Sequence, residues 1–215
     1  MFRNRAEAAN LLAQRLQGRE LQDPLVLAIP RGGVVTGAVL ALELGAELDV
    51  VLARKLRAPG QPELAVGAVA EEGQVYLNQP IEELLGLPEE YVARERAYQL
   101  SELARRKELF RAVRPPAPLA GRSVIVTDDG IATGATMSAA LQVARAQKPH
   151  ELIVAVPVAS PDRLEEIRRR CDEVICLLVP RSFWAISQSY KDFPPVEDHE
   201  ALELLRTSLP THQTV

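Results

Sequence analysis

The chain has 215 residues, of which 47% are hydrophobic and 25% are charged, so it is long enough to bury a full-sized core. These values exclude the disordered and fibrous classes and favour a single α/β domain. The 25 basic and 29 acidic residues give a net charge of −4, so no overall basic field favours nucleic acid or an anionic membrane as the partner.

The first quarter of the chain predicts a βαβ unit. Residues 25–29, L-V-L-A-I, are a short apolar run between turn residues, which is typical of a buried strand. Gly45 is a typical residue to end the helix that follows. Four elements are expected, namely a helix at 5–17, a strand at 25–29, a helix at 34–44 and a strand at 48–56. This order predicts parallel strands that are joined by a right-handed crossover.

The middle of the chain, about 57–113, is expected to be an insertion. Residues 57–63, R-A-P-G-Q-P-E, have the composition of a loop. Two strand-like runs at 64–70 and 74–78 flank Glu71-Glu72-Gly73, which favours an antiparallel hairpin. Residues 88–112 then suit a long, charged helix.

The second half returns to alternating strands and helices. We expect strands at 123–127, 151–157 and 173–179, with helices at 134–147 and 161–170 between them. Residues 181–215 form an irregular tail. The prediction is an α/β fold with a doubly wound, mostly parallel sheet, and one domain whose core spans about 22–180. Ligands in such sheets bind outside the carboxyl ends of the strands, which selects the loops at 30–33, 54–57 and 128–136.

Two carboxylates, Asp128 and Asp129, directly follow the strand at 123–127, and a loop of small and hydroxyl residues follows them. The amides at the start of the next helix suit an anion, and small residues let a phosphate approach the backbone. No G-K-[ST] sequence occurs, so this is not a Walker A loop. Adjacent acids need a sugar diol or a bound Mg²⁺ to offset their repulsion. A ribose 5-phosphate satisfies both features, and a solvated Asp-Asp turn is the alternative.

Residues 124–136, V-I-V-T-D-D-G-I-A-T-G-A-T, resemble the signature of type I phosphoribosyltransferases, and the strand and helix order around them agrees over most of 25–179. The resemblance implies the substrate 5-phosphoribosyl 1-diphosphate (PRPP) with Mg²⁺. It also implies that Asp128 and Asp129 hold the ribose 2- and 3-hydroxyls. We expect Mg²⁺ to be held mainly by PRPP, so no metal ligand is assigned to the protein, and Asp128 and Asp129 are the candidates for a contact. The 5-phosphate would be gripped by Gly130, Ile131, Ala132, Thr133, Gly134, Ala135 and Thr136.

A second anion site is expected at Pro30, Arg31, Gly32 and Gly33, where two glycines allow close approach and an arginine supplies charge. In the resembled family this is the diphosphate loop, often with an unusual cis peptide bond. Lys55, at the expected end of the strand at 48–56, would neutralise the leaving diphosphate, and the alternative is that it only solvates the strand end. The hairpin region would form a lid.

The acceptor is not identified by the sequence. Some purine-transferring relatives carry an acid where this chain has Ala132, and adenine-transferring relatives have a small residue there. The small residue at position 132 therefore slightly favours an adenine-type enzyme. Phe183 or Trp184 would stack on a base, and a hydrophobic hood or a contact in a homodimer is the alternative for both.

The function expected is therefore phosphoribosyl transfer from PRPP to a nitrogen acceptor. The alternatives are a non-catalytic PRPP-binding regulator and a protein that binds another sugar phosphate. Cys171 and Cys176 lack a partner pair for zinc, and we interpret them as free thiols. No run of about 18 apolar residues occurs, and residues 1–16 resemble an amphipathic helix rather than a signal peptide. We expect a cytoplasmic protein that works on small molecules without nucleic acid or membrane.

Overall fold

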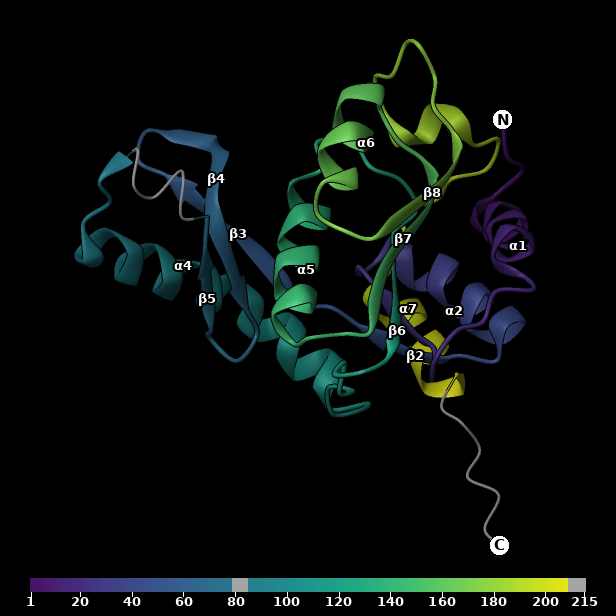
Figure 1. Ribbon diagram of the computed structural model, residues 1–215, viewed down its shortest axis with the longest axis horizontal. Coiled ribbons are helices and arrows are strands. Elements are labelled where there is room, and N and C mark those ends of the chain that lie inside the picture. Colours follow the sequence, from purple (N-terminus) through teal and green to yellow (C-terminus); the bar gives the residue numbers. More distant parts are fainter. Residues whose placement is uncertain (79–84, 209–215) are drawn as a thin grey trace, which may run out of the picture.

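The computed structural model describes residues 1–78 and 85–208, and the core of this part is a five-stranded parallel sheet (Figure 1). Its strands, in the spatial order β2-β1-β6-β7-β8, are β1 (Leu25–Ala28), β2 (Glu47–Val50), β6 (Ser123–Thr127), β7 (Glu151–Val158) and β8 (Glu173–Leu178). Every residue of β1 and of β6 is buried. Strands buried on both faces have no polar side to expose, which explains their nearly continuous apolar sequences.

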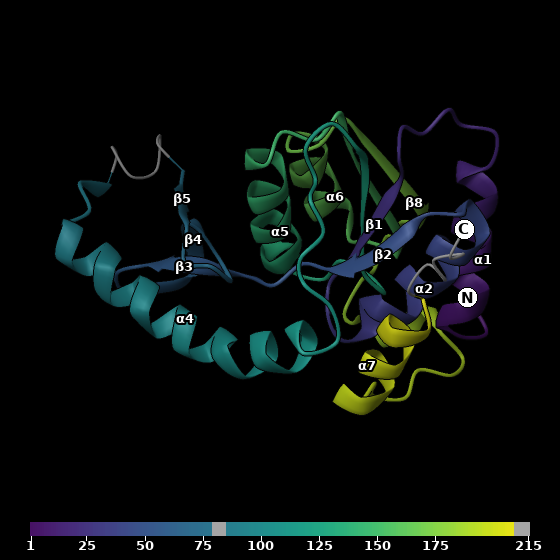
Figure 2. The same ribbon diagram turned by 90° about the horizontal axis from the view of Figure 1, so that it is seen from below.

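Helices cover both faces of this sheet, as predicted for a doubly wound fold (Figure 2). One face carries α1 (Arg5–Leu16), α2 (Gly32–Leu44) and α7 (Asp198–Thr207), and the other carries α5 (Ala135–Ala146) and α6 (Pro161–Arg168). Successive residues of β1 alternate between the two packed layers, with Val26 and Ala28 in one and Leu25 and Leu27 in the other. Within the described residues, none of the helices is both long and apolar enough to span a membrane.

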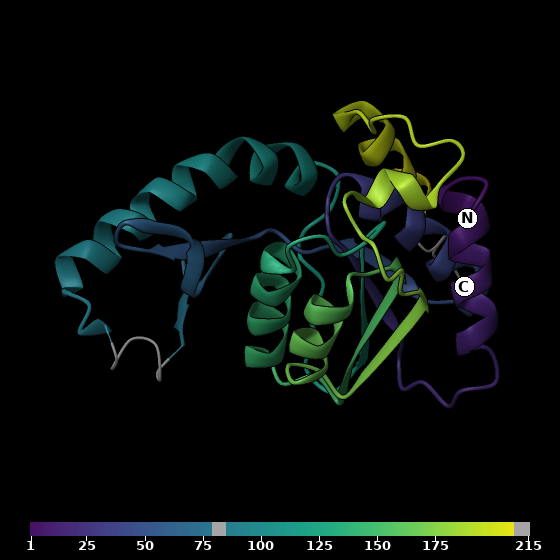
Figure 3. The same cartoon turned by 90° about the horizontal axis from the view of Figure 1, so that it is seen from above.

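A second, antiparallel sheet stands beside the core (Figures 2 and 3). It has the order β3-β4-β5, with β3 (Ala53–Ala58), β4 (Gln61–Ala70) and β5 (Val75–Leu77), and α4 (Glu89–Arg111) runs along it. We call residues 53–78 and 85–111 the arm. The predicted hairpin and long helix are both present in it. Ala68 and Ala70 of β4 pack with Ala139 and Val143 of α5, so the arm contacts the helix that follows the acid pair.

Two predictions in this region were wrong. The expected strand at 48–56 is divided after Val50, and its two parts belong to different sheets. The ladder between β2 and β1 ends where β1 ends, at Ala28 paired with Val50, and residues from Ala53 onward pair with β4 instead. The expected loop at 57–63 contains the end of β3, a turn at Gly60 with φ of +68° and the start of β4. Hydrophobic periodicity does not reveal which partner a strand will pair with.

The region expected to be an irregular tail, 181–215, contains a 3₁₀ helix, η1 (Ile186–Ser189), and then α7. A capping box between Glu197 and Glu200 begins α7, and Ala201 and Leu205 bury their side chains in the core. Residues 209–215 lie outside the described part. The Glu-x-x-Glu spacing before an A-L-E-L-L run was the signal in the sequence that predicts this helix.

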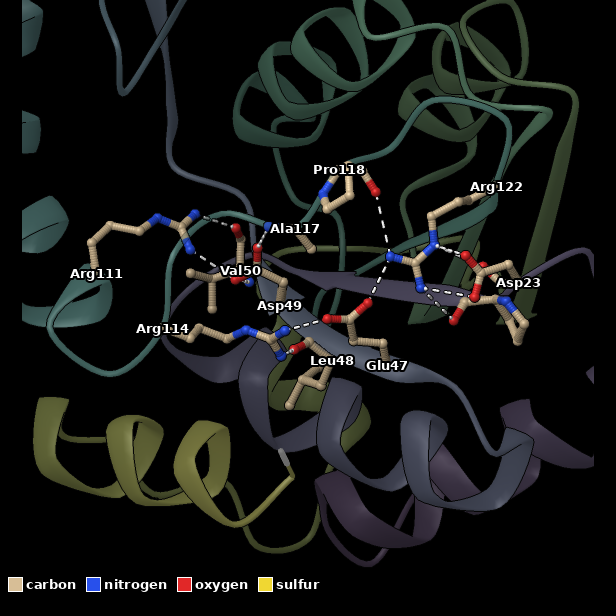
Figure 4. A network of polar contacts seen from close by, with 11 residues as sticks. Asp23, Glu47, Leu48, Asp49, Val50, Arg111, Arg114, Ala117, Pro118 and Arg122 are labelled. Atoms are coloured by element: carbon tan, nitrogen blue, oxygen red, sulfur yellow. Dashed lines mark hydrogen bonds and ion pairs between the residues drawn. The ribbon is translucent and has the colours of Figure 1, made fainter. Parts of the chain in front are cut away.

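β2 lies at one edge of the parallel sheet, and an arginine from the end of the arm contacts it (Figure 4). Arg111 donates to Asp49 Oδ1 at 2.8 Å, to the carbonyl of Val50 at 3.0 Å and to both carboxylate oxygens of Glu71. The second oxygen of Asp49 accepts the amide of Ala117 at 2.8 Å. A charge-paired network thus links the arm to an edge strand that would otherwise present unpaired backbone groups.

The same edge is completed by two more arginines from the segment between α4 and β6 (Figure 4). Arg114 donates to the carbonyl of Leu48 and to Glu47, and Arg122 donates to the other oxygen of Glu47 at 2.6 Å. The outward carbonyls of Leu48 and Val50 on β2 therefore each accept a hydrogen bond from an arginine. This segment fixes the arm to the core and seals the edge of the sheet at the same time.

We predict that Arg111→Met destabilises the protein strongly. The substitution leaves Asp49 and Glu71, whose side chains are 2% and 7% exposed, without their shared cation. Removing one partner of a buried pair costs about 3–5 kcal/mol in the free energy of unfolding, measured by urea denaturation. The control is Arg206→Met, because the pair of Arg206 with Glu203 is 60% and 62% exposed. That change should cost less than about 1 kcal/mol, and equal losses in the two variants would contradict the prediction.

Candidate active site

Two of the three predicted loops meet at the carboxyl edge of the sheet. β1 and β6 are neighbours, with Ala28 opposite Thr127, and the amide of Ile29 donates to the carbonyl of Thr127 at 3.0 Å. The loop after β1 therefore begins beside Asp128. Its peptide bond between Pro30 and Arg31 is cis, as the family resemblance implied.

Gly32 and Gly33 pack directly on the two acids. A Cβ atom at position 32 would lie 2.0 Å from Oδ2 of Asp129, and one at position 33 would lie 3.0 Å from Cα of Asp128. Only glycine leaves room for this approach. The expected diphosphate loop and the acid pair are therefore one continuous structure, although about 100 residues separate them in the chain.

The two carboxylates have different surroundings. Asp129 is 8% exposed, and its Oδ2 accepts Nε of Arg5 at 2.8 Å. Asp128 is partly exposed, and its Oδ1 accepts the amide of Asp129 at 2.8 Å. Burial, with the nearby charge of Asp129, raises the pKa of Asp128 well above the ordinary range of an aspartate. Only Asp129 is thus in direct contact with a cation, although the charge of Arg5 also acts to lower the pKa of Asp128.

Arg5 is a site residue that our reading of the sequence missed. It lies in the first turn of α1, more than 120 residues before the acids, and its side chain is buried. Tyr190 is another, because its hydroxyl donates to the carbonyl of Asp129 at 2.7 Å. An arginine at a helix start and a tyrosine in a polar tail carry no local signal, because only the folded chain brings them to the acids.

The expected 5-phosphate loop, residues 130–136, leads into the N-terminus of α5. Gly134, with φ of +75°, is the residue that precedes the first turn of the helix. The amide of Ile131 donates to the carbonyl of Val158 at 2.8 Å, which ties the loop to the end of β7. Ala132, Thr133 and Thr136 are exposed at the surface, so the loop presents small and hydroxyl side chains beside a helix N-terminus.

Lys55 comes to this loop from an unexpected direction. It belongs to β3 of the arm and not to the end of a parallel strand, which corrects its predicted position. It nevertheless lines a cavity of about 320 Å³ together with Thr133, Ala135 and Arg163. The structure therefore brings Lys55 to the predicted phosphate loop. Its neighbour Arg54 donates to Gln99 of α4 at 2.6 Å, within the arm.

Arg31 faces the start of α7. Its guanidinium is 3.6 Å from Glu197 and 3.7 Å from Asp198, and its side chain is 38% exposed. Arg31 is part of the expected diphosphate loop. In this structure its ion-pair partners are two acids of the C-terminal region.

The two predicted base contacts, Phe183 and Trp184, precede in the chain the residue that covers the loop. Trp184 is 84% exposed, and Phe183 packs against a cluster that contains Phe2 and Tyr190. Ile186 instead lies over the loop, because a Cβ atom at Gly130 would be 2.8 Å from its side chain. The part of the C-terminal segment that covers the loop at Gly130 is therefore η1.

Side chains for a metal ion are few here. The described residues contain no cluster of three or more His, Cys, Asp or Glu side chains that could hold a metal. Mg²⁺ commonly binds through one or two carboxylates together with substrate phosphates and water. Asp128 and Asp129 fit that mode, in which the substrate carries most of the ligands.

Comparison with known proteins agrees with this geometry. The sequence model of the phosphoribosyl transferase domain matches residues 3–193. The chain is 42% identical over 205 residues to a Mycobacterium tuberculosis protein named "Putative phosphoribosyl transferase", a match that covers 95% of this chain and 46% of that protein. The chain thus spans about half the length of this relative.

A solved structure extends the likeness to three dimensions. The crystal structure of TT1426 from Thermus thermophilus is 45% identical, with a TM-score of 0.92, and the match covers 96% of this chain and 98% of that one. The family match includes both loops, the acid pair and the helices that position them. The chain therefore belongs to the phosphoribosyl transferase domain family.

Proposed function

We propose that the protein transfers the phosphoribosyl group of PRPP to a nitrogen of a small acceptor, with Mg²⁺ and with release of diphosphate. The observation that carries the proposal is the contact of Gly32 and Gly33 with Asp129 and Asp128. It joins a backbone loop suited to one anion with a pair of acids suited to a diol. The N-terminus of α5, suited to a second anion, follows at once.

The chain's own groups have separate tasks in this reaction. The acid pair would orient the ribose, and the amides at 130–136 would hold the 5-phosphate. The bond from C1 to the diphosphate oxygen would break with its electron pair leaving on the diphosphate, and the acceptor nitrogen would form a bond to C1 and release its proton to the departing diphosphate. Arg31, Lys55 and the glycine amides would stabilise the charge that develops on the departing diphosphate. Bound Mg²⁺ would add positive charge to the same leaving group.

The loop at 130–136 lacks a carboxylate at the position where some purine-transferring relatives have one. Ala132 is exposed and cannot move a proton, and Ile186 of η1 adds an apolar surface beside Gly130. These features support an acceptor that needs no acid from the loop. We therefore place adenine-type bases first among the candidates.

Incubation with PRPP, Mg²⁺ and a panel of nucleobases tests the proposal. We expect diphosphate release that depends on one class of base, and a decrease of about 100-fold in its rate in Lys55→Ala. Lys148→Ala is the control, since Lys148 is exposed at the far end of α5, and it should leave the rate unchanged. Tight PRPP binding without release for any base would instead support a non-catalytic regulator, and absence of PRPP binding would exclude both functions.

We predict that Asp128→Asn weakens PRPP binding and yet stabilises the free protein. A hydrogen bond to a charged group contributes about 1.5–3 kcal/mol, so the affinity measured by calorimetry should fall about 10- to 100-fold. The amide oxygen can still accept the amide of Asp129, so the loop keeps its local contact. The stability gain arises because a carboxylate next to Asp129 is removed.

The stability gain has a defined pH dependence. Because the pKa of Asp128 is raised in the folded protein, the folded state binds more protons than the unfolded state above about pH 4. Wild-type stability should therefore decline as the pH rises from about 4 through the raised pKa. The melting temperatures of wild type and Asp128→Asn should be similar near about pH 4 and diverge toward neutral pH. A difference that does not change with pH would contradict this assignment.

We predict that Gly32→Ala disrupts binding through the acid pair. The new methyl group would lie 2.0 Å from Oδ2 of Asp129, so the loop or the carboxylate must move. Displacements near 1 Å in a site can cost about 100-fold, and we expect a loss of this size in PRPP affinity. Gly121→Ala is the matched control, because Gly121 has φ of +74° and open space around its Cα. That variant should lose about 1–2 kcal/mol of stability and keep its affinity.

A further inference from the structure

The surroundings of Asp129 differ from those of Asp128. Arg5 of α1 is 7% exposed, and its Nε donates to Oδ2 of Asp129 at 2.8 Å. Its Nη1 donates to the carbonyl of Pro194 at 2.8 Å, and its guanidinium lies 3.7 Å from the centre of the Phe193 ring. The cation is thus enclosed by the C-terminal segment on one side and by Asp129 on the other.

Further contacts hold the backbone of Asp129. The Tyr190 hydroxyl donates to its carbonyl at 2.7 Å, and the Tyr190 ring stacks on Phe193 with 4.7 Å between centroids. Gly32 lies over Oδ2 on the remaining side, and a Cβ atom there would also be 3.4 Å from Nε of Arg5. The charged oxygen of Asp129 that meets Arg5 is therefore covered.

A ribose hydroxyl is a poor replacement for this arrangement. If Asp129 turned toward a diol, the buried Arg5 would lose the carboxylate that it directly contacts, and a hydroxyl group carries no charge to replace it. Among the described residues Asp128 forms no direct ion pair with Arg5, because its Oδ1 accepts the amide of Asp129 and its carboxyl group lies beside that of Asp129. As a whole residue Asp128 is less completely buried than Asp129, although its carboxyl group is shielded from water.

We propose that the two acids divide the work, with Asp128 receiving the ribose diol and Asp129 acting with Arg5 as a positioning pair. The pair fixes the backbone from which Asp128 projects and the surface on which Gly32 rests. It also ties α1 and the C-terminal segment to the site. This division rests on the proposed function, because it concerns how the same site recognises the ribose of PRPP.

The test compares ribose 5-phosphate with 2-deoxyribose 5-phosphate by calorimetry without Mg²⁺, so that the ratio of the two affinities reports hydroxyl recognition alone. The variants are Asp128→Asn, Asp129→Asn, Arg5→Gln and the double variant Arg5→Gln/Asp129→Asn. A hydrogen bond to a charged group changes an affinity by about tenfold or more, so wild type should prefer ribose by that factor. A fold effect would weaken both sugars equally and leave the ratio unchanged.

We expect Asp128→Asn to lose the preference for ribose. The single variants Arg5→Gln and Asp129→Asn should bind both sugars more weakly, because each leaves one buried charge unpaired. The double variant removes both charges, and it should recover a preference within about threefold of wild type, which is well inside the effect of one charged hydrogen bond.

Loss of the preference in the double variant would show that Asp129 contacts the diol itself, and this would overturn the division of roles. Retention of the preference in Asp128→Asn would overturn the division as well. Because asparagine keeps the shape of the aspartate side chain, this variant provides a test even if the Arg5 variants do not fold. Both results leave the proposed function intact. Failure of wild type to bind either sugar phosphate or PRPP would overturn the function and the division together.

Discussion

The arrangement of the candidate site depends on the buried ion pair between Arg5 and Asp129. Two adjacent carboxylates at a strand end repel each other, and the repulsion must be offset by a cation or by protonation of one acid. Arg5 supplies the cation for Asp129 at 2.8 Å, while Asp128 keeps a raised pKa. Because the same guanidinium contacts Phe193, the pair connects the N-terminal helix, the acid motif and the C-terminal segment. Gly32 then packs on this pair, so the loop after β1 depends on it too.

The second determinant of the site is the position of α5 between two sheets. One side of this helix packs on the parallel sheet, and Ala139 and Val143 meet the small residues of β4 on the other side (Figures 1 and 2). The loop at its N-terminus is therefore held by the core and by the arm. This explains how Lys55 of β3 reaches the same cavity as Thr133 although it lies outside the parallel sheet. Helix α5 thus links Lys55 of the arm to the expected phosphate loop of the core.

The parts that the sequence predicted are those with local causes. The run from Val124 to Thr136 combines a strand period, two acids and small residues, and each of these features acts within a few residues. The division of 48–56 into two strands had no local signal. Residues up to Val50 pair with β1 and residues from Ala53 pair with β4, and this choice of partner depends on the rest of the fold and not on the sequence of the strand. Arg5 and Tyr190 could not be predicted either, because they reach Asp129 from distant parts of the chain. The helix α7 was predictable in principle, since its Glu197 and Glu200 carry a capping pattern.

On the proposed function, Arg31 is a cation that can exchange its protein partners for the substrate. Its distances of 3.6 and 3.7 Å to Glu197 and Asp198, with side chains that are 38%, 59% and 22% exposed, describe loose ion pairs. Such pairs contribute at most about 1 kcal/mol each, because water screens them and side-chain entropy opposes them. A diphosphate offers several negative charges and the bidentate geometry that a guanidinium prefers. On the proposed function, exchange of these two acids for the substrate is therefore favourable, and α7 can remain packed on the core while the cation turns toward the loop.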